Sequence, residues 1–407
     1  MLTVIPDYRV WCDRCNWNLQ TPAENVELHT PFDKLYFKLS QRHSETLLTT
    51  MTRTAPNLWR RQFTLSRFAT FLLATSVHVL SLALLSAGVW LLALYGHNLF
   101  AQFGSLVSFC LAWFARPRLG KLPEGYADPQ DFPALYGLAH KVSKALGTTD
   151  VSIIEISPDF NASFSQVGLR QKKVLTLGAP LLFLLDGEEL VALISHELAH
   201  GVNGDPLRGL YVGTALSTLL NWHDVLHPRT LLESFLDIFI LPPRLAVYLL
   251  AKLCEAAANL LLSLSWRDSQ RAEYLADYLA ATVSGTEAQL GVLRKLNLSG
   301  TFQTTLQQVA LEQQRDVGFF ETFAANVAKL PERELERLRR LERLPSSRVD
   351  TTHPPTVYRL DFQTAHPQQG RVRLSPEDDE RLRRELSRAH PKLQKRLVDA
   401  FRSNLYY

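Results

Sequence analysis

The longest apolar run of the chain covers residues 68–95, which are 28 positions without Lys, Arg, Asp or Glu. A second uncharged run of 17 residues, 99–115, follows the short polar turn Gly96-His97-Asn98. A helix needs about 20 apolar residues to cross the hydrocarbon core of a bilayer. The pattern therefore predicts a transmembrane helical hairpin at 68–115, and its length and internal position exclude a cleaved signal peptide.

Basic residues flank this hairpin on both sides, and its turn carries none: Arg53, Arg60, Arg61 and Arg67 precede it, and Arg116, Arg118 and Lys121 follow. By the positive-inside rule, both ends of the hairpin and the chain beyond it face the cytoplasm. We therefore expect a multi-pass protein of the cytoplasmic (inner) membrane. The alternative is a soluble protein in which the hairpin is packed.

A less apolar region occupies residues 209–222 and 235–264. The second segment is interrupted by Asp237, Pro242-Pro243, Arg244, Lys252 and Glu255. Two interpretations stay open: two further spans with functional polar residues, or amphipathic helices that lie along the membrane. The number of spans is accordingly two or four.

The patterns of hydrophobic and polar residues outside these apolar segments predict a globular domain. Residues 133–147 have the pattern of an amphipathic helix, and 151–156 and 173–177 that of short strands. Residues 331–344 predict a solvated helix with internal ion pairs, and 376–407 a basic helical tail that packs on the domain. With 407 residues, 46% of them hydrophobic, the chain can hold a membrane unit plus one globular domain.

The most informative motif is His196-Glu197-Leu198-Ala199-His200, an HExxH sequence within a predicted helix. Asp186 as N-cap and Glu189 three residues later form a capping-box pattern, and Gly201 with residues 203–206 predicts the end of the helix. Histidines at i and i+4 share a helix face and can hold one Zn²⁺. Glu197 lies about 100° around the helix, where a general base for a zinc-activated water belongs.

A catalytic zinc site needs a third protein ligand and one open position. A predicted helix at 266–283 carries Glu273 and Asp277 on one face. We take Glu273 as the third ligand and Asp277 as the carboxylate that orients a ligand histidine. The spacing alone is weak support, because solvated helices contain many such pairs.

The net charge and the cysteine content bear on possible partners, disulfides and further metal sites. A net charge of +4 without a basic cluster argues against nucleic acid as the partner. Cys110 and Cys254 occur in apolar segments and are predicted to be buried thiols, and a cytoplasmic domain would hold no disulfide framework. Cys12 and Cys15 form a CxxC segment, which is either a degenerate or dimer-completed zinc knuckle, and so an accessory zinc site, or a structural remnant.

Four motifs in order resemble those of the membrane zinc endopeptidases of the HtpX and CAAX-prenyl-endopeptidase (Ste-type) family, over about residues 68–362. They are Asn161-Ala162-Ser163-Phe164, the run HELAHGVNGD at 196–205, Arg271 to Asp277, and Thr352-His353-Pro354-Pro355-Thr356 followed by Arg359. The chain departs from the family in its short basic run at 269–272 and in the weak span character of its later apolar segments.

The resemblance implies one catalytic Zn²⁺ held by His196, His200 and Glu273. It also implies that His353 and Arg359 reach the site and steady the oxyanion or the ligand shell. Asp205, in the Asn-Gly-Asp turn, joins Asp277 as a supporting carboxylate, and residues 161–164 form the strand that pairs with substrate.

The expected fold class is a mainly α membrane protein, with a transmembrane helical hairpin and a gluzincin-like zinc-protease domain that has a small β-sheet. The expected function is endopeptidase cleavage of membrane or membrane-proximal proteins in quality control. A catalytically silent zinc-binding membrane scaffold is the alternative; the oligomeric state and the substrate stay open. The expected organisation is 1–20 CxxC segment, 21–67 linker, 68–115 hairpin, 116–205 first catalytic part, 206–265 second apolar region, 266–363 second catalytic part and 364–407 tail.

Overall fold

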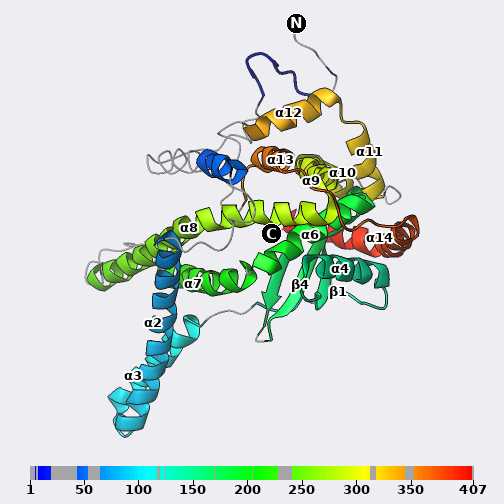
Figure 1. Ribbon diagram of the computed structural model, residues 1–407. Helices are drawn as coiled ribbons and strands as arrows, with labels where there is room; N and C mark the ends of the chain where they lie inside the picture. The colour runs from blue at the N-terminus through cyan, green and yellow to red at the C-terminus, as the bar shows by residue number, and fades with distance from the viewer. Residues whose placement is uncertain are drawn as a thin grey trace.

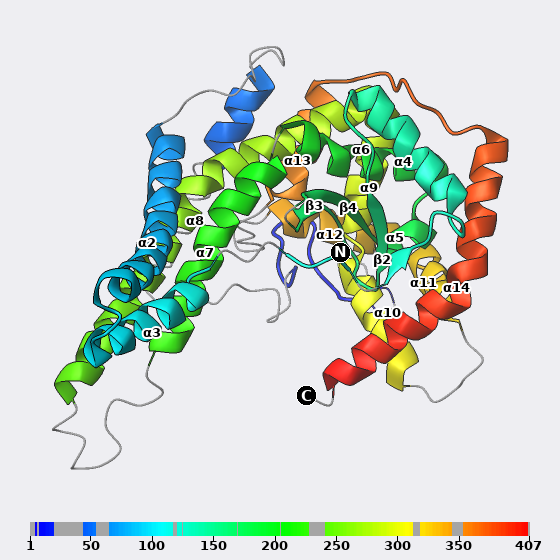
Figure 2. The ribbon, with the colours of Figure 1, turned by 90° about the horizontal axis from the view of Figure 1, so that it is seen from below.

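The computed structural model is dominated by helices and contains one small sheet. It describes residues 5, 8–19, 44–53, 65–116, 120–123, 125–168, 170–203, 205–227, 241–311, 318–343 and 353–405. Two regions are visible in Figures 1 and 2: a domain in which helices surround the sheet, and an arm of long helices that projects from it.

The sheet has the strand order β1-β2-β4-β3. Its strands are β1 (Tyr126–Ala127), β2 (Ile153–Ser157), β3 (Ala162–Val167) and β4 (Lys172–Gly178). β2 and β4 are parallel and confirm the two strands predicted from the sequence. β3 pairs antiparallel with β4 and forms an edge of the sheet.

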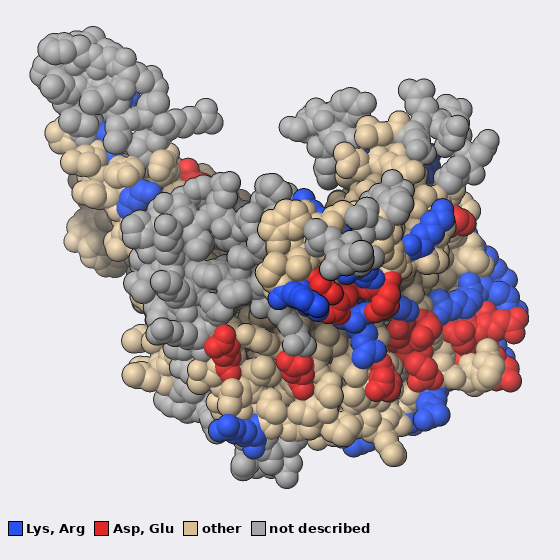
Figure 3. Space-filling view, turned by 90° about the horizontal axis from the view of Figure 1, so that it is seen from above, with Lys and Arg blue, Asp and Glu red and all other residues tan. Residues whose placement is uncertain are grey.

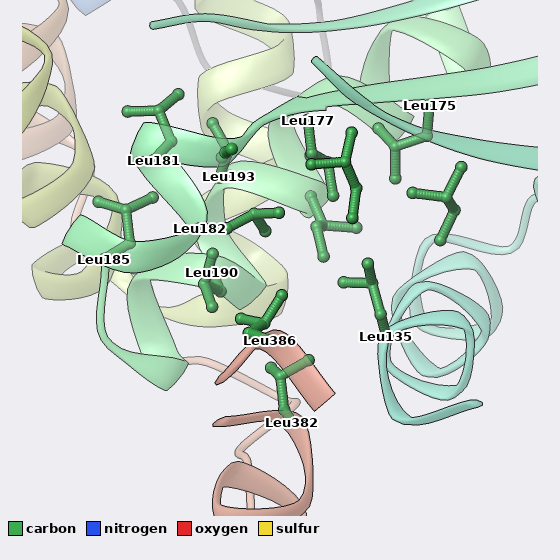
Figure 4. Close-up of a cluster of buried hydrophobic side chains, with 14 of the residues drawn as sticks. Leu135, Leu175, Leu177, Leu181, Leu182, Leu185, Leu190, Leu193, Leu382 and Leu386 are labelled. Atoms are coloured by element: carbon green, nitrogen blue, oxygen red, sulfur yellow. The ribbon is translucent and has the colours of Figure 1, made fainter. Parts of the chain in front are cut away.

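Leucine side chains from four helices and from β4 meet in the core of the domain (Figure 4). The helices are α4 (Pro133–Leu146), α5 (Ala179–Leu184), α6 (Gly187–Asn203) and α14 (Pro376–Leu405). The tail, α14, packs on the domain as predicted. Its buried Glu385 accepts hydrogen bonds from the backbone N–H groups of Ala134 and Leu135, which fixes α14 to the start of α4.

The start of α6 has the geometry that the capping-box pattern predicts. The backbone N–H of Glu189 donates to Asp186 Oδ1 at 2.9 Å, and the N–H of Asp186 donates to Glu189 Oε2 at 2.8 Å. The end of the helix at Asn203 falls within the stretch 201–206 that the sequence predicts for it. The helix therefore extends about one turn past His200, the second histidine of the motif.

Within the described part of the chain, four helices build the arm, in which α2 (Leu65–Tyr95) and α3 (Leu99–Phe114) form the predicted hairpin. α7 (Asp205–Leu226) and the first half of α8 (Leu241–Ser284) run beside α2. Cys254 is buried as predicted, but Cys110 is exposed, which corrects its assignment as a buried thiol. α3 contacts its neighbours through one face, and Cys110 lies on the other.

The helix α8 spans 44 residues without a break and crosses the boundary expected at 265/266. Pro242 and Pro243, which the sequence analysis took as an interruption, lie in its first turn. A proline is tolerated there because the first N–H groups of a helix have no partner within it. One continuous helix therefore joins the arm to the domain.

The remaining helices lie C-terminal to α8 and surround the domain. They are α9 (Thr286–Leu296), α10 (Ser299–Leu311), α11 (Phe319–Ala328), α12 (Glu332–Arg343) and α13 (Thr356–Ala365). α12 carries internal ion pairs, as predicted. Within the region expected to be a linker, residues 44–53 are helical, and Met51 packs against Tyr274 and Phe362.

Candidate metal centre

Two helices bring the HExxH histidines and Glu273 together. His196 and His200 come from α6, and Glu273 comes from the second half of α8, which packs along α6. His196 Nε2 lies 3.5 Å from Glu273 Oε2, and His200 Nε2 lies 3.5 Å from Glu273 Oε1. One ligand atom from each residue falls within 4.8 Å of the other two. Two histidines from neighbouring turns of α6 and a glutamate from a distant part of the sequence thus converge on one point.

This cluster has the donor set and spacing that a zinc ion requires. Two imidazole nitrogens and a carboxylate oxygen are typical zinc ligands, and bonds of about 2.1 Å in tetrahedral geometry place them about 3.4 Å apart. Glu273 Oε2 is buried and accepts no hydrogen bond of good geometry from any described residue, although His353 Nδ1 lies 2.9 Å away. A bound cation would satisfy this oxygen.

The charges around the cluster favour an ionised carboxylate. Burial by itself raises the pKa of Glu273, but the contacts with His196 and His353 outweigh it and hold that pKa well below its ordinary value. Burial also disfavours a charged imidazole, yet Asp277 and Glu273 raise the pKa of His196 to about 10. A metal at this site therefore competes with a proton on His196.

Asp277 joins the centre to α13. Its Oδ1 lies 2.9 Å from His196 Nδ1, which leaves His196 Nε2 directed at Glu273. Arg359, from α13, donates to both oxygens of Asp277, at 2.7 Å from Nε and 2.6 Å from Nη2. Burial of Asp277 would raise its pKa, but Arg359 overcomes this and lowers it to about 2. The result is a buried ion pair that holds the ring of a candidate ligand histidine.

Glu197 and His353 complete the surroundings of the centre. Glu197 is 8% exposed on α6, and its charge acts on Arg359. His353 lies just before α13, and its half-exposed side chain meets Glu273 through Nδ1 at 2.9 Å. Glu197 and His353 thus lie by the ligands, one buried on the motif helix and the other at the surface.

The edge strand β3 lies against the end of α6. Residues 161–164 lead into and begin this strand, and the carbonyl oxygen of Asn161 accepts a hydrogen bond from the N–H of Gly178 at 2.8 Å. A Cβ on Gly201 would lie 2.8 Å from the ring of Phe164. Glycine directly after the second histidine of the motif therefore allows β3 to approach the centre.

Three of the predicted site residues are not seen at the metal centre, and one residue that supports the centre was not predicted. The side chain of Asp205 falls outside the described part of the chain. Cys12 and Cys15 form a turn held on α12 and do not join the centre. Gln289, which we did not predict, is 1% exposed and donates to Asp277 Oδ1 at 2.9 Å. Its signal in the sequence, one amide on an amphipathic helix, is too common to be informative.

Comparison with known proteins assigns the family. The model of peptidase family M48 matches residues 135–400, which is more than half of the chain and includes every described residue of the centre. No curated protein and no solved structure matches the chain. The matched segment contains α6, α8 and α13, the three helices that build the His-His-Glu cluster and its supporting ion pair. The chain belongs to peptidase family M48.

Proposed function

We propose that the protein is a zinc-dependent endopeptidase of the HtpX type, anchored in the cytoplasmic membrane. The observation that carries this proposal is the convergence of His196, His200 and Glu273 from two helices, with ligand atoms within 4.8 Å of one another. His196, His200 and Glu273 would hold Zn²⁺ and leave a fourth position open. When bound, the ion supplies Lewis acidity, which acidifies water and polarises a carbonyl oxygen.

Glu197 acts as the general base. It lies one residue after His196 on α6 and is 8% exposed, so its carboxylate is shielded from bulk solvent beside the ligands. It accepts a proton from the attacking water and delivers that proton to the leaving amine. This role requires an ionised carboxylate before the attack and a carboxylic acid afterwards.

His353 and Arg359 have different parts in this proposal. Arg359 is committed to Asp277 by two short hydrogen bonds, which suits a residue that positions His196. The side chain of His353 is 47% exposed, so it can face a substrate while it contacts Glu273. We therefore assign stabilisation of the developing oxyanion to His353 and support of the ligand shell to Arg359.

Membrane anchoring rests on the arm. α2 and α8, from Pro242 onward, are long and apolar enough to cross a bilayer. Only 11% of the most apolar 18-residue stretch of α2 is buried. A helix in the core of a soluble protein would be mostly covered. The basic residues that flank the hairpin favour a cytoplasmic position for the domain. The substrates are then membrane or membrane-proximal proteins, as in quality control.

The exposed edge of β3 suits a peptidase with broad specificity. An extended substrate can add to an edge strand through main-chain hydrogen bonds, which require no particular side chain. Because Phe164 at the start of this strand contacts the end of α6, a peptide bound there would run past the histidines.

The test is Glu197→Gln in the full chain purified in detergent, with Glu188→Gln on the same helix as the matched control. We expect about one tightly bound zinc at the centre in all three proteins. Cleavage of casein should fall about 10²–10⁴-fold in Glu197→Gln alone. Retained cleavage in that variant would remove Glu197 as the base. Zinc without cleavage in the wild type as well would favour the scaffold alternative.

A further inference from the structure

A second pair of histidines four residues apart lies at the end of α7, outside the catalytic centre. The ring centroids of His223 and His227 are 5.1 Å apart, close to the 5.0 Å between His196 and His200. Figures 1 and 2 show α7 running beside the arm half of α8. From that helix, Glu255 places its Oε2 3.9 Å from His223 Nε2.

The register of α8 explains why this group resembles the catalytic cluster. Glu255 and Glu273 are 18 residues apart. At 3.6 residues per turn this is five full turns, so both carboxylates project from the same face of α8, about 27 Å apart. α6 packs on this helix at one end and α7 at the other. On α6 both histidines of the pair face Glu273, and on α7 His223 faces Glu255, with His227 one turn further along.

The orientation of His223 also matches that of His196. Asp224 Oδ1 lies 3.1 Å from His223 Nδ1, which leaves Nε2 facing Glu255. In the catalytic centre, Asp277 Oδ1 holds His196 Nδ1 at 2.9 Å. A carboxylate on the far nitrogen of a histidine fixes its tautomer and its ring for metal binding.

We propose that His223, His227 and Glu255 form a second site for a divalent transition metal, Zn²⁺, which clamps the end of α7 to α8. Among the described residues, only His196, His200 and Glu273 already bring three ligand atoms within 4.8 Å of one another, so His227 has to turn toward Glu255 to complete the second site. Ligands of a tetrahedral ion lie about 3.4 Å apart, so the 3.9 Å separation between His223 and Glu255 also has to close by about half an ångström. The site is independent of the proposed peptidase activity, because its residues lie five helical turns of α8 from Glu273.

Lys252 is the competitor for this site. Its Nζ lies 2.7 Å from Glu255 Oε2, where it balances the carboxylate charge. Because the lysine ammonium sits on a flexible four-carbon stem, it can turn away from Glu255 when a metal enters. Removing its charge should therefore strengthen metal binding, an effect that misfolding cannot imitate.

The test measures zinc per chain in the full-length protein in detergent micelles, after dialysis against trace Zn²⁺. We expect two zinc ions in the wild type, one in His223→Ala/His227→Ala and one in His196→Ala/His200→Ala. His140→Ala, which removes an exposed histidine that also faces an aspartate, is the control and should keep two. In the background without His196 and His200, Co²⁺ titration followed by visible absorption should show about tenfold tighter binding in Lys252→Met and loss of the band in Glu255→Gln.

The outcomes separate this site from the proposed function. One zinc in the wild type, lost with His196→Ala/His200→Ala and unaffected by His223→Ala/His227→Ala, overturns the second site and leaves the peptidase centre standing. One zinc that follows only His223 and His227 supports the second site and removes the catalytic one. Unchanged Co²⁺ affinity in Lys252→Met also overturns the proposal.

Discussion

Asp277 is the residue whose replacement tests the supporting ion pair most directly. It is fully buried, and its oxygens meet three partners: Arg359 at 2.6 and 2.7 Å, His196 at 2.9 Å and Gln289 at 2.9 Å. Asp277→Asn keeps the shape of the side chain but removes its charge. It also turns one acceptor into an amide, which faces a donor of Arg359 in either orientation because Arg359 donates to both oxygens.

Two costs follow from this change. Removal of one partner from a buried ion pair costs about 3–5 kcal/mol, since the remaining charge is buried without compensation. Glu273 Oε2 lies 3.8 Å from Arg359 Nη1 and offsets part of that charge, so we expect the lower end, about 3 kcal/mol. Loss of the carboxylate behind a ligand histidine weakens metal binding about 10–100-fold, which is about 1.4–2.7 kcal/mol.

The assay combines denaturant unfolding of the metal-free protein with zinc competition against a chelator. Asp150→Asn is the matched control, because Asp150 faces His140 Nδ1 at the same 2.9 Å on the exposed surface of the domain. We expect the control to change stability by less than about 0.5 kcal/mol and zinc affinity not at all. If Asp277→Asn behaves like the control in both measurements, the ion pair does not position His196 and the reasoning is refuted.

Three further predictions test the fold and the proposed role of β3 in binding substrate. Leu386→Ala removes a side chain from the core where α14 meets α6, and unfolding should show a loss of about 2–5 kcal/mol. Gly201→Ala places a methyl group 2.8 Å from the ring of Phe164, so the KM for peptides should rise several-fold while zinc content stays unchanged. Burial raises the pKa of Tyr136 above its ordinary value of 10, so its stabilising contribution is complete below pH 10 and is lost as the pH rises through the folded pKa. Tyr136→Phe should therefore flatten the fall of stability above about pH 10 in denaturant titrations.

The sequence predicted those features that depend on neighbouring residues. The capping box at Asp186 and Glu189, the strands β2 and β4 and the hairpin of the arm all follow from local patterns. The pairing of His196 with His200 follows from helix periodicity alone. Charged residues of both signs are spread along the chain, and they are also mixed on the surface. Figure 3, which views the molecule from above, shows acidic and basic side chains interspersed over one side of that face.

The same local patterns do not predict contacts between segments that are distant in the sequence. Helix spacing alone supported Glu273 as a ligand only weakly, and family resemblance strengthened the assignment, because nothing local distinguishes Glu273 from other helical glutamates. Gln289 supports Asp277 from another helix, and Met51 packs against Tyr274 from a region expected to be a linker. The exposure of Cys110 likewise depends on which face of α3 its neighbours cover, and apolar composition does not specify a face.

The unbroken helix α8 connects the arm to the candidate metal centre. Its 44 residues extend about 66 Å, and no proline or glycine follows Pro243 before its end at Ser284. Sharp kinks need such residues or an inserted side chain, so this helix transmits tilt along its length. Its arm half is anchored against α2 and α7 through Leu261, whereas its domain half carries Glu273. Because His196 and His200 lie on a different helix, the angle between α6 and α8 sets the distance between the ligands. The position of the arm in a bilayer therefore bears directly on the geometry of the candidate metal centre.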